Sequence, residues 1–327
     1  MTQGIRGHDT QYDATYMALY GNANPYAFCY GYVAMVLWFL GYPDQALRGM
    51  EEVLKFATEL ASPLTLAGAR GFAPLVYHCC RQGGRVQEQG EAGIAVATQM
   101  GFPFWRAIGR FWRGWGLAEQ GHYKEGIQQM QQGLRAQRET GSSVHQVHFS
   151  VLLAEAYGRA GHCEEGSHRL AEAETQMEKT DERFYEAELW RIKGELTLAG
   201  AGGLRLGIGS TSPQASSLKP IDPSGVEREV EEYFHKAIDI AHQQQAKSLE
   251  LRAVMSFVRL RQQRLMGNGS RNTDQVTSTA LAEEHSMLAE VYGWFTEGFE
   301  TKDLQEAKVL LNELAVNSPS LRSETLR

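Results

Sequence analysis

The sequence predicts an all-α chain built as a stack of helical hairpins. A phrase made of a glycine, a polar stretch and then a small residue begins at Gly41, Gly121 and Gly161, with a weaker copy at Gly84. The intervals between successive copies are 43, 37 and 40 residues, and a repeat of this length is typical of stacked helix pairs. With only nine prolines in 327 residues, we expect a right-handed superhelical solenoid of about six extended hairpins and a C-terminal capping helix.

Four hairpins follow in order from residue 25. Gly just after one helix and Pro near the start of the next separate them, as at Ser62-Pro63 and Gly101-Phe-Pro103. The eight helices expected in this part are 25–40 with 45–60, 64–81 with 86–100, 104–120 with 123–140, and 145–160 with 164–179.

The fifth hairpin opens at 183–198 with an apolar stripe, and a matching stripe resumes at Val226. The two stripes consist of Tyr185, Leu189, Ile192 and Leu196, and of Val226, Val230, Phe234, Ala237 and Ala241. A sixth hairpin is expected from 248–264 and 280–295, and a capping helix at 303–314.

The solenoid is thus expected over 25–317. The polar, Gly- and Ser-rich stretches at about 200–225 and 267–277 predict disordered inserts within it. Residues 1–24 are expected to be the remnant of a preceding repeat, so that the chain is a fragment or a shortened relative. Residues 318–327 are expected to form a frayed tail.

Small residues recur where the two helices of a hairpin should cross. Gly114, Ala154 and Gly194 lie seven residues before a turn, and Ala46, Gly126 and Gly166 lie five residues after a turn glycine. A larger side chain at these positions would push the helices apart, which predicts close packing of small residue against small residue.

Composition excludes several classes of protein. Lys and Arg number 32 against 39 Asp and Glu, and this mild acidity gives no signal for nucleic acid. The four cysteines form neither a disulfide framework nor a paired zinc motif. The N-terminus lacks the apolar core of a signal peptide, and the most apolar run, 33–40, is too short to span a bilayer. We therefore expect a cytoplasmic protein that does not contact membranes.

The glycine and small-residue positions, together with Trp190-Arg-Ile-Lys-Gly-Glu-Leu196, resemble the tetratricopeptide repeat. The unit here is nearer 40 residues than the usual 34. Five phrases, within 40–47, 153–161, 186–196, 245–253 and 291–299, are similar to the C-terminal region of bacterial signalling proteins. In those proteins a class III adenylate/guanylate cyclase domain and a STAND-type AAA ATPase precede the repeats.

The resemblance implies a non-catalytic sensor or assembly arm whose partner is a protein or peptide, such as an upstream ATPase or cyclase domain. The chain has no Gly-x-x-x-x-Gly-Lys-Ser/Thr phosphate loop, so none of the family's chemistry carries over to it. We expect no catalytic residue, no cofactor and no metal in this chain.

Tetratricopeptide register predicts which side chains would face a concave groove for the partner. The candidates are Phe28, Met35, Trp38, Ile108, Phe111, Trp115, His148, Glu155, Glu188 and Arg191. The groove would be apolar at its N-terminal side and more polar toward the fifth hairpin.

Other constellations allow alternative interpretations. Three tryptophans and three arginines lie between Trp105 and Trp115, where a small-molecule or nucleotide sensor could have its pocket; packing between hairpins is the simpler interpretation. His145 and His148 have a spacing that could hold a metal with a third ligand, but surface histidines near a helix start are the favoured interpretation. His78-Cys79-Cys80 is interpreted as core packing.

Overall fold

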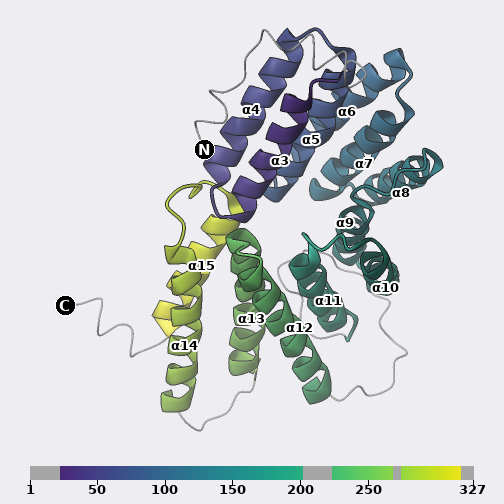
Figure 1. Cartoon of the computed structure of the whole chain (residues 1–327). Helices are drawn as coiled ribbons and strands as arrows, with labels where there is room; N and C mark the ends of the chain where they lie inside the picture. Colours follow the sequence, from purple (N-terminus) through teal and green to yellow (C-terminus); the bar gives the residue numbers. More distant parts are fainter. Residues whose placement is uncertain (1–22, 202–222, 268–273, 318–327) are drawn as a thin grey trace. The chain divides into compact units, whose positions relative to one another are not determined.

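The computed structural model describes residues 23–201, 223–267 and 274–317, and every regular element in these ranges is a helix (Figure 1). The all-α prediction is therefore confirmed. The helices are α3 (Pro25–Phe39), α4 (Pro43–Glu59), α5 (Pro63–Cys79), α6 (Gly83–Met100), α7 (Pro103–Glu119), α8 (Tyr123–Glu139), α9 (Gln146–Arg159), α10 (Cys163–Thr180), α11 (Glu186–Gly200), α12 (Pro223–Gln243), α13 (Lys247–Gly267), α14 (Asp274–Gly293) and α15 (Lys302–Asn317). None of the helices in this described part is long and apolar enough to cross a membrane.

Prolines set the beginnings of several helices. Pro25, Pro43, Pro63, Pro103 and Pro223 are the first residues of α3, α4, α5, α7 and α12. The first helical N–H has no partner inside the helix, so proline loses nothing there and its fixed φ favours the helical conformation. The sequence-based starts of α4, α5 and α7 were one or two residues too late because they took the residues after the proline.

The turn glycines behave as expected in three hairpins and differently in one. Gly41, Gly121 and Gly161 have φ of 91°, 90° and 82°, a left-handed conformation that glycine adopts without steric cost. Gly84 is not a turn glycine, because it lies inside the first turn of α6. The left-handed residue of that turn is Arg81, with φ of 54°.

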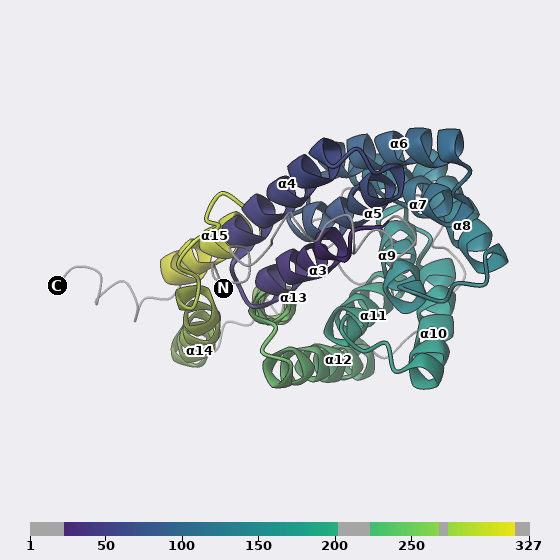
Figure 2. The same ribbon diagram turned by 45° about the horizontal axis from the view of Figure 1, so that its top comes forward.

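The chain divides into two compact units. The first comprises residues up to Val144 apart from 39–42, and the second comprises 39–42 and the residues from His145 onward. In the first unit α5 packs on α4 and α6, and α7 packs on α5, α6 and α8. In the second unit α9, α11, α13 and α15 each contact the next, while α10, α12 and α14 pack beside them. Figure 2 shows α10, α12 and α14 along one side of α9, α11 and α13.

The predicted small-residue crossings are present in the third and fourth hairpins. A Cβ atom added to Gly126 of α8 would lie 2.6 Å from the carbonyl oxygen of Gly114 in α7. A Cβ added to Gly166 would lie 3.0 Å from the carbonyl oxygen of Ala154. Both distances are shorter than van der Waals contact, so the helix backbones touch at these points.

The helices of the fifth hairpin pack differently at their crossing. Gly194 of α11 faces the ring of Phe234, whose Cε1 would lie 2.6 Å from an added Cβ. Here glycine makes room for an aromatic side chain of α12, and not for a second small residue. Phe234 belongs to a core with Leu198, Val230, Phe257 and Leu260.

The apolar stripes of the fifth hairpin are confirmed, since each of their residues is buried except Val226, which is partly buried. The predicted insert boundaries were too wide. Residue 200 is the last of α11, α12 begins at Pro223 and α14 begins at Asp274, so 223–225 and 274–277 are helical. Residues 202–222 and 268–273 of the inserts, residues 1–22 and the tail at 318–327 lie outside the described residues.

Replacement of Gly126 by alanine tests the crossing. We expect Gly126→Ala to lower the free energy of unfolding by about 1–3 kcal/mol, because the new methyl group meets backbone atoms that can move only if the helices separate. The matched control is Gly84→Ala, where an added Cβ has no neighbour within 4 Å. That change should leave stability unchanged or raise it by up to about 1 kcal/mol, through helix propensity. Urea unfolding measures both, and equal stability of Gly126→Ala and wild type would contradict the close crossing.

Candidate functional site

Most of the predicted groove residues of the first unit are buried. Ile108, Phe111 and Trp115 of α7 are 4%, 1% and 5% exposed, and Met35 and Trp38 of α3 are buried as well. Phe28 is partly buried, with its ring 5.6 Å from that of Phe72 and 5.9 Å from that of Trp105. The structure thus gives these side chains a packing role. A partner could reach the buried ones only after a rearrangement.

The aromatic stretch from Trp105 to Trp115 packs against α5. The ring of His78 lies 5.1 Å from that of Trp112 and 5.6 Å from that of Trp115. A Cβ added to Gly71 of α5 would lie 2.7 Å from the Trp105 ring. These indoles therefore pack between α5 and α7.

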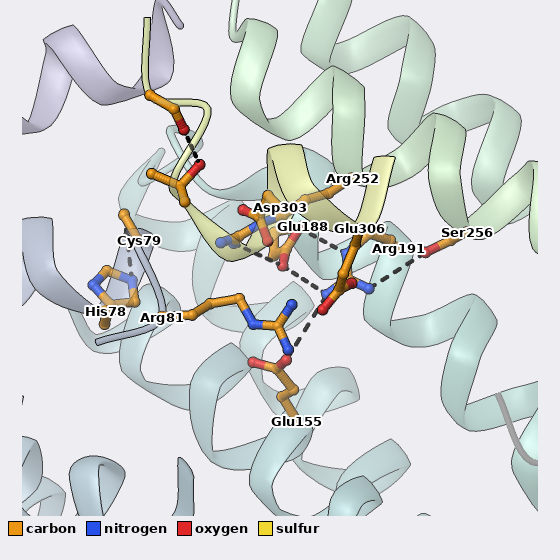
Figure 3. Close-up of polar contacts among 12 residues, drawn as sticks. His78, Cys79, Arg81, Glu155, Glu188, Arg191, Arg252, Ser256, Asp303 and Glu306 are labelled. Carbon is orange, nitrogen blue, oxygen red and sulfur yellow. Dashed lines mark hydrogen bonds and ion pairs between the residues drawn. The ribbon is translucent and has the colours of Figure 1, made fainter. Parts of the chain in front are cut away.

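In the second unit the predicted groove residues Glu155, Glu188 and Arg191 belong to a largely buried set of charges, which we call the ionic network (Figure 3). It connects α9, α11, α13 and α15. Its members are Glu155, Arg159, Glu188, Arg191, Glu195, Arg252, Ser256 and Asp303.

Arg191 is the centre of the ionic network. Its guanidinium binds Glu188 through two parallel hydrogen bonds, from Nε to Oε2 at 2.8 Å and from Nη2 to Oε1 at 2.7 Å. This bidentate geometry is the strongest that an arginine and a carboxylate form. Helical spacing brings the partners together, because Glu188 and Glu195 lie three residues before and four residues after Arg191.

Contacts between helices extend the ionic network in both directions. Toward α9, Nη2 of Arg191 lies 3.9 Å from Oε1 of Glu155, which also pairs with Arg159 at 2.7 Å. Toward α13, Ser256 donates to Glu195 at 3.0 Å.

Arg252 carries the ionic network from α11 to α15. Its Nη1 lies 3.5 Å from Oε1 of Glu188, and its Nε donates to Oδ2 of Asp303 at 2.7 Å. Asp303 is the second residue of α15, where a negative charge also interacts favourably with the positive end of the helix dipole. The side chains of both Arg252 and Asp303 are about one-tenth exposed.

The charges of the ionic network compensate one another. Burial alone would lower the pKa of the Arg191 guanidinium, but the surrounding carboxylates, Glu188 first, outweigh it and raise that pKa well above its ordinary value. Arg191 therefore stays charged. No side chain among the ionic network's ion pairs is more than 19% exposed. Such an arrangement positions helices, because its charged groups are engaged with each other.

His148, the remaining groove candidate, is buried at the start of α9, so its interpretation as a surface histidine was wrong. Its backbone N–H donates to Oε1 of Glu182 at 3.0 Å, so a carboxylate from the α10–α11 connection caps α9. The ring of His145 lies 6.2 Å from that of His148, and burial lowers the pKa of His145 to about 4. Among the described residues, no three His, Cys, Asp or Glu side chains gather as metal ligands would.

Sequence reasoning placed Glu155, Glu188 and Arg191 on one face but did not find their partners on α13 and α15. Arg252 and Ser256 lie 64 and 65 positions from the residues they contact, and Asp303 lies 51 positions from Arg252. No local spacing signals such pairs. A weaker signal was available. Ionisable residues recur on α9, α11 and α13, the first helices of successive hairpins, where an apolar face would be expected.

No protein-family model matches the chain, and no curated protein matches it.

Two arginines of α13 give a matched test of the ionic network. Arg252 binds Asp303 at 2.7 Å and Arg259 binds Glu306 at 3.0 Å, so both join α13 to α15. The first pair is about one-tenth exposed and the second more than one-third. We expect Arg252→Met to cost about 3–5 kcal/mol, because it leaves buried carboxylates uncompensated. Arg259→Met should cost less than about 1 kcal/mol.

Urea unfolding at neutral pH measures both changes. If both variants lose the same free energy of unfolding, burial does not distinguish the two ion pairs. The ionic network would then contribute no more to stability than a surface ion pair does.

Proposed function

We propose that the chain is a non-catalytic scaffold of tetratricopeptide-like hairpins, arranged as a right-handed solenoid, that binds a protein or peptide. The hairpin period of about 40 residues and the glycine phrases support this proposal. The resemblance of five phrases to the C-terminal repeats of bacterial cyclase and ATPase signalling proteins suggests the context. In that context the chain acts in the cytoplasm as a sensor or assembly arm, with an upstream ATPase or cyclase domain as partner.

The observation that carries the proposal is a row of helices in the second unit. We call it the row of first helices, because it consists of the first helices of three successive hairpins and the last helix, α15. Helices α9, α11, α13 and α15 lie side by side and are joined by compensated charges. A surface whose side chains are already fixed loses little conformational entropy on binding, which favours recognition of a partner. The same engaged charges are poorly suited to acid–base catalysis, for which a group must be free to exchange a proton with a substrate.

The accessible parts of this face define the partner's chemistry. Arg259 and Glu306 are each more than one-third exposed, and Arg159 and Glu195 are exposed at 19% and 17%. Both signs of charge are therefore presented along the row. We infer a partner surface that alternates acidic and basic side chains, since complementary charges raise the association rate and fix the orientation of a complex.

Site-specific photo-crosslinking tests the proposal. A photoreactive amino acid in place of Arg259 would lie on the row of first helices, and one in place of Glu172 of α10 would lie at a similarly exposed position on a second helix. In the native host we expect the first variant to crosslink to one protein that contains an ATPase or cyclase domain, and the second to give no such product. Equal products from both positions, or none from Arg259, would contradict the proposed face.

Thermal-shift measurements separate the alternative, a small-molecule or nucleotide sensor with its pocket near Trp105–Trp115. Under the scaffold proposal, nucleotides and metabolites leave the melting temperature unchanged. Stabilisation by such a ligand, with no crosslinked partner, would favour the sensor. Cyclase activity or nucleotide hydrolysis by this chain alone would contradict the non-catalytic proposal.

A further inference from the structure

One glutamate occupies a position in the core of the second unit where the helix pattern calls for an apolar residue. Glu284 lies in α14 between Leu281 and Leu288, at spacings of three and four residues, so all three share one face. Leu281 and Leu288 belong to a buried cluster with residues of α13 and α15. Glu284 itself is 2% exposed.

The carboxyl group of Glu284 has no compensating hydrogen bond. Both of its oxygens are buried, and neither accepts a hydrogen bond from any group in the described part of the chain. This contrasts with the carboxylates of the ionic network, which arginine side chains bind directly. A buried carboxylate without such a partner is costly, whereas the protonated acid is tolerated far better in apolar surroundings.

The charged groups around Glu284 do not remove this cost. Arg261 of α13 is the nearby cation, but its Nε lies 3.4 Å from Oε1 of Glu231 on α12. Glu231 and the neighbouring Glu283 oppose a second negative charge. His285 follows Glu284 directly in α14. From α15 the cluster receives the apolar side chains of Leu304, Ala307, Leu310, Leu311 and Leu314.

We propose that Glu284 makes the packing of α14 against α13 depend on a proton. With the carboxyl protonated, α14 and α15 close over the apolar face of α13. When the proton leaves to solvent, the charged carboxylate favours an opened α14, in which water reaches it. The packing of the last hairpin, α13 with α14, therefore depends on pH, whatever partner the protein binds.

The opening of α14 responds to pH close to neutrality. Burial raises the pKa of Glu284 from 4.5 to about 7, with Arg261 opposing the rise. In the opened form the carboxyl is solvated, so its pKa returns toward 4.5. The closed form therefore binds the proton more tightly, and closure is favoured at low pH. The opening equilibrium should rise by up to ten-fold per pH unit between about 4.5 and 7 and level off above that range.

Hydrogen exchange of the full chain tests the proposal. Protection factors correct for the pH dependence of the chemical exchange step, so they report the opening equilibrium itself. We expect protection of the α14 amides to fall from pH 5 to pH 7 in the wild type. The α11 amides, in the same unit, should change less and serve as the internal reference.

Three variants isolate the carboxyl group. Glu284→Gln and Glu284→Leu should both give pH-independent protection of α14, and the leucine variant keeps the test available if the buried amide weakens folding. Glu290→Gln changes an exposed residue of the same helix that is not among the charges acting on Glu284, and it should retain the wild-type slope. A wild-type protection that varies less than two-fold across this range would overturn the proposal, as would a slope that persists in Glu284→Leu.

Discussion

The close approach of helix backbones is the constraint on which the hairpins depend. Helix α7 is held this way on two sides, by α6 near Gly90 and by α8 near Gly126. A Cβ added to either glycine would lie 2.6 Å from a backbone atom of α7. Helices that touch along their backbones can shift only together, so the crossing residues also fix the register of each pair. The short turns at Gly121 and Gly161 are compatible with this geometry because glycine reverses the chain without strain.

Charge has a different role from close packing in the second unit. Neighbouring first helices could slide along one another if only leucines and alanines separated them. The contacts of Arg252 with Glu188 of α11 and with Asp303 of α15 favour a single alignment of α11, α13 and α15. Buried ion pairs contribute little net stability against apolar replacements, so register is the better explanation for keeping them. Glu284 differs, because its carboxyl lacks such an arginine partner and its charge is therefore conditional.

Burial changes where a partner would be expected to bind. The large apolar candidates, such as Phe111 and Trp115, pack the interior, and the exposed rims of the first helices present mixed charges. Recognition by a scaffold of this type would depend on charge complementarity at those rims more than on insertion of an apolar side chain. Such surfaces favour selective and readily reversible binding.

The sequence by itself determined the helices and their pairing, because helical periodicity, proline starts and glycine turns are local signals. It located the beginnings of the described helices to within about three residues, except for α14, which begins at Asp274 and not at the expected residue 280. It also placed Gly114 opposite Gly126 from their distances to a common turn. It misplaced the turn at Gly84, since Arg81 adopts the left-handed conformation without any sign in its residue type. Only the tertiary structure decided that Trp115 is covered, that Glu188 meets Arg252, and that Glu284 lacks a hydrogen-bond donor among the described residues. These facts depend on side chains from helices distant in sequence, and a helix's own periodicity contains no information about which of them will approach it.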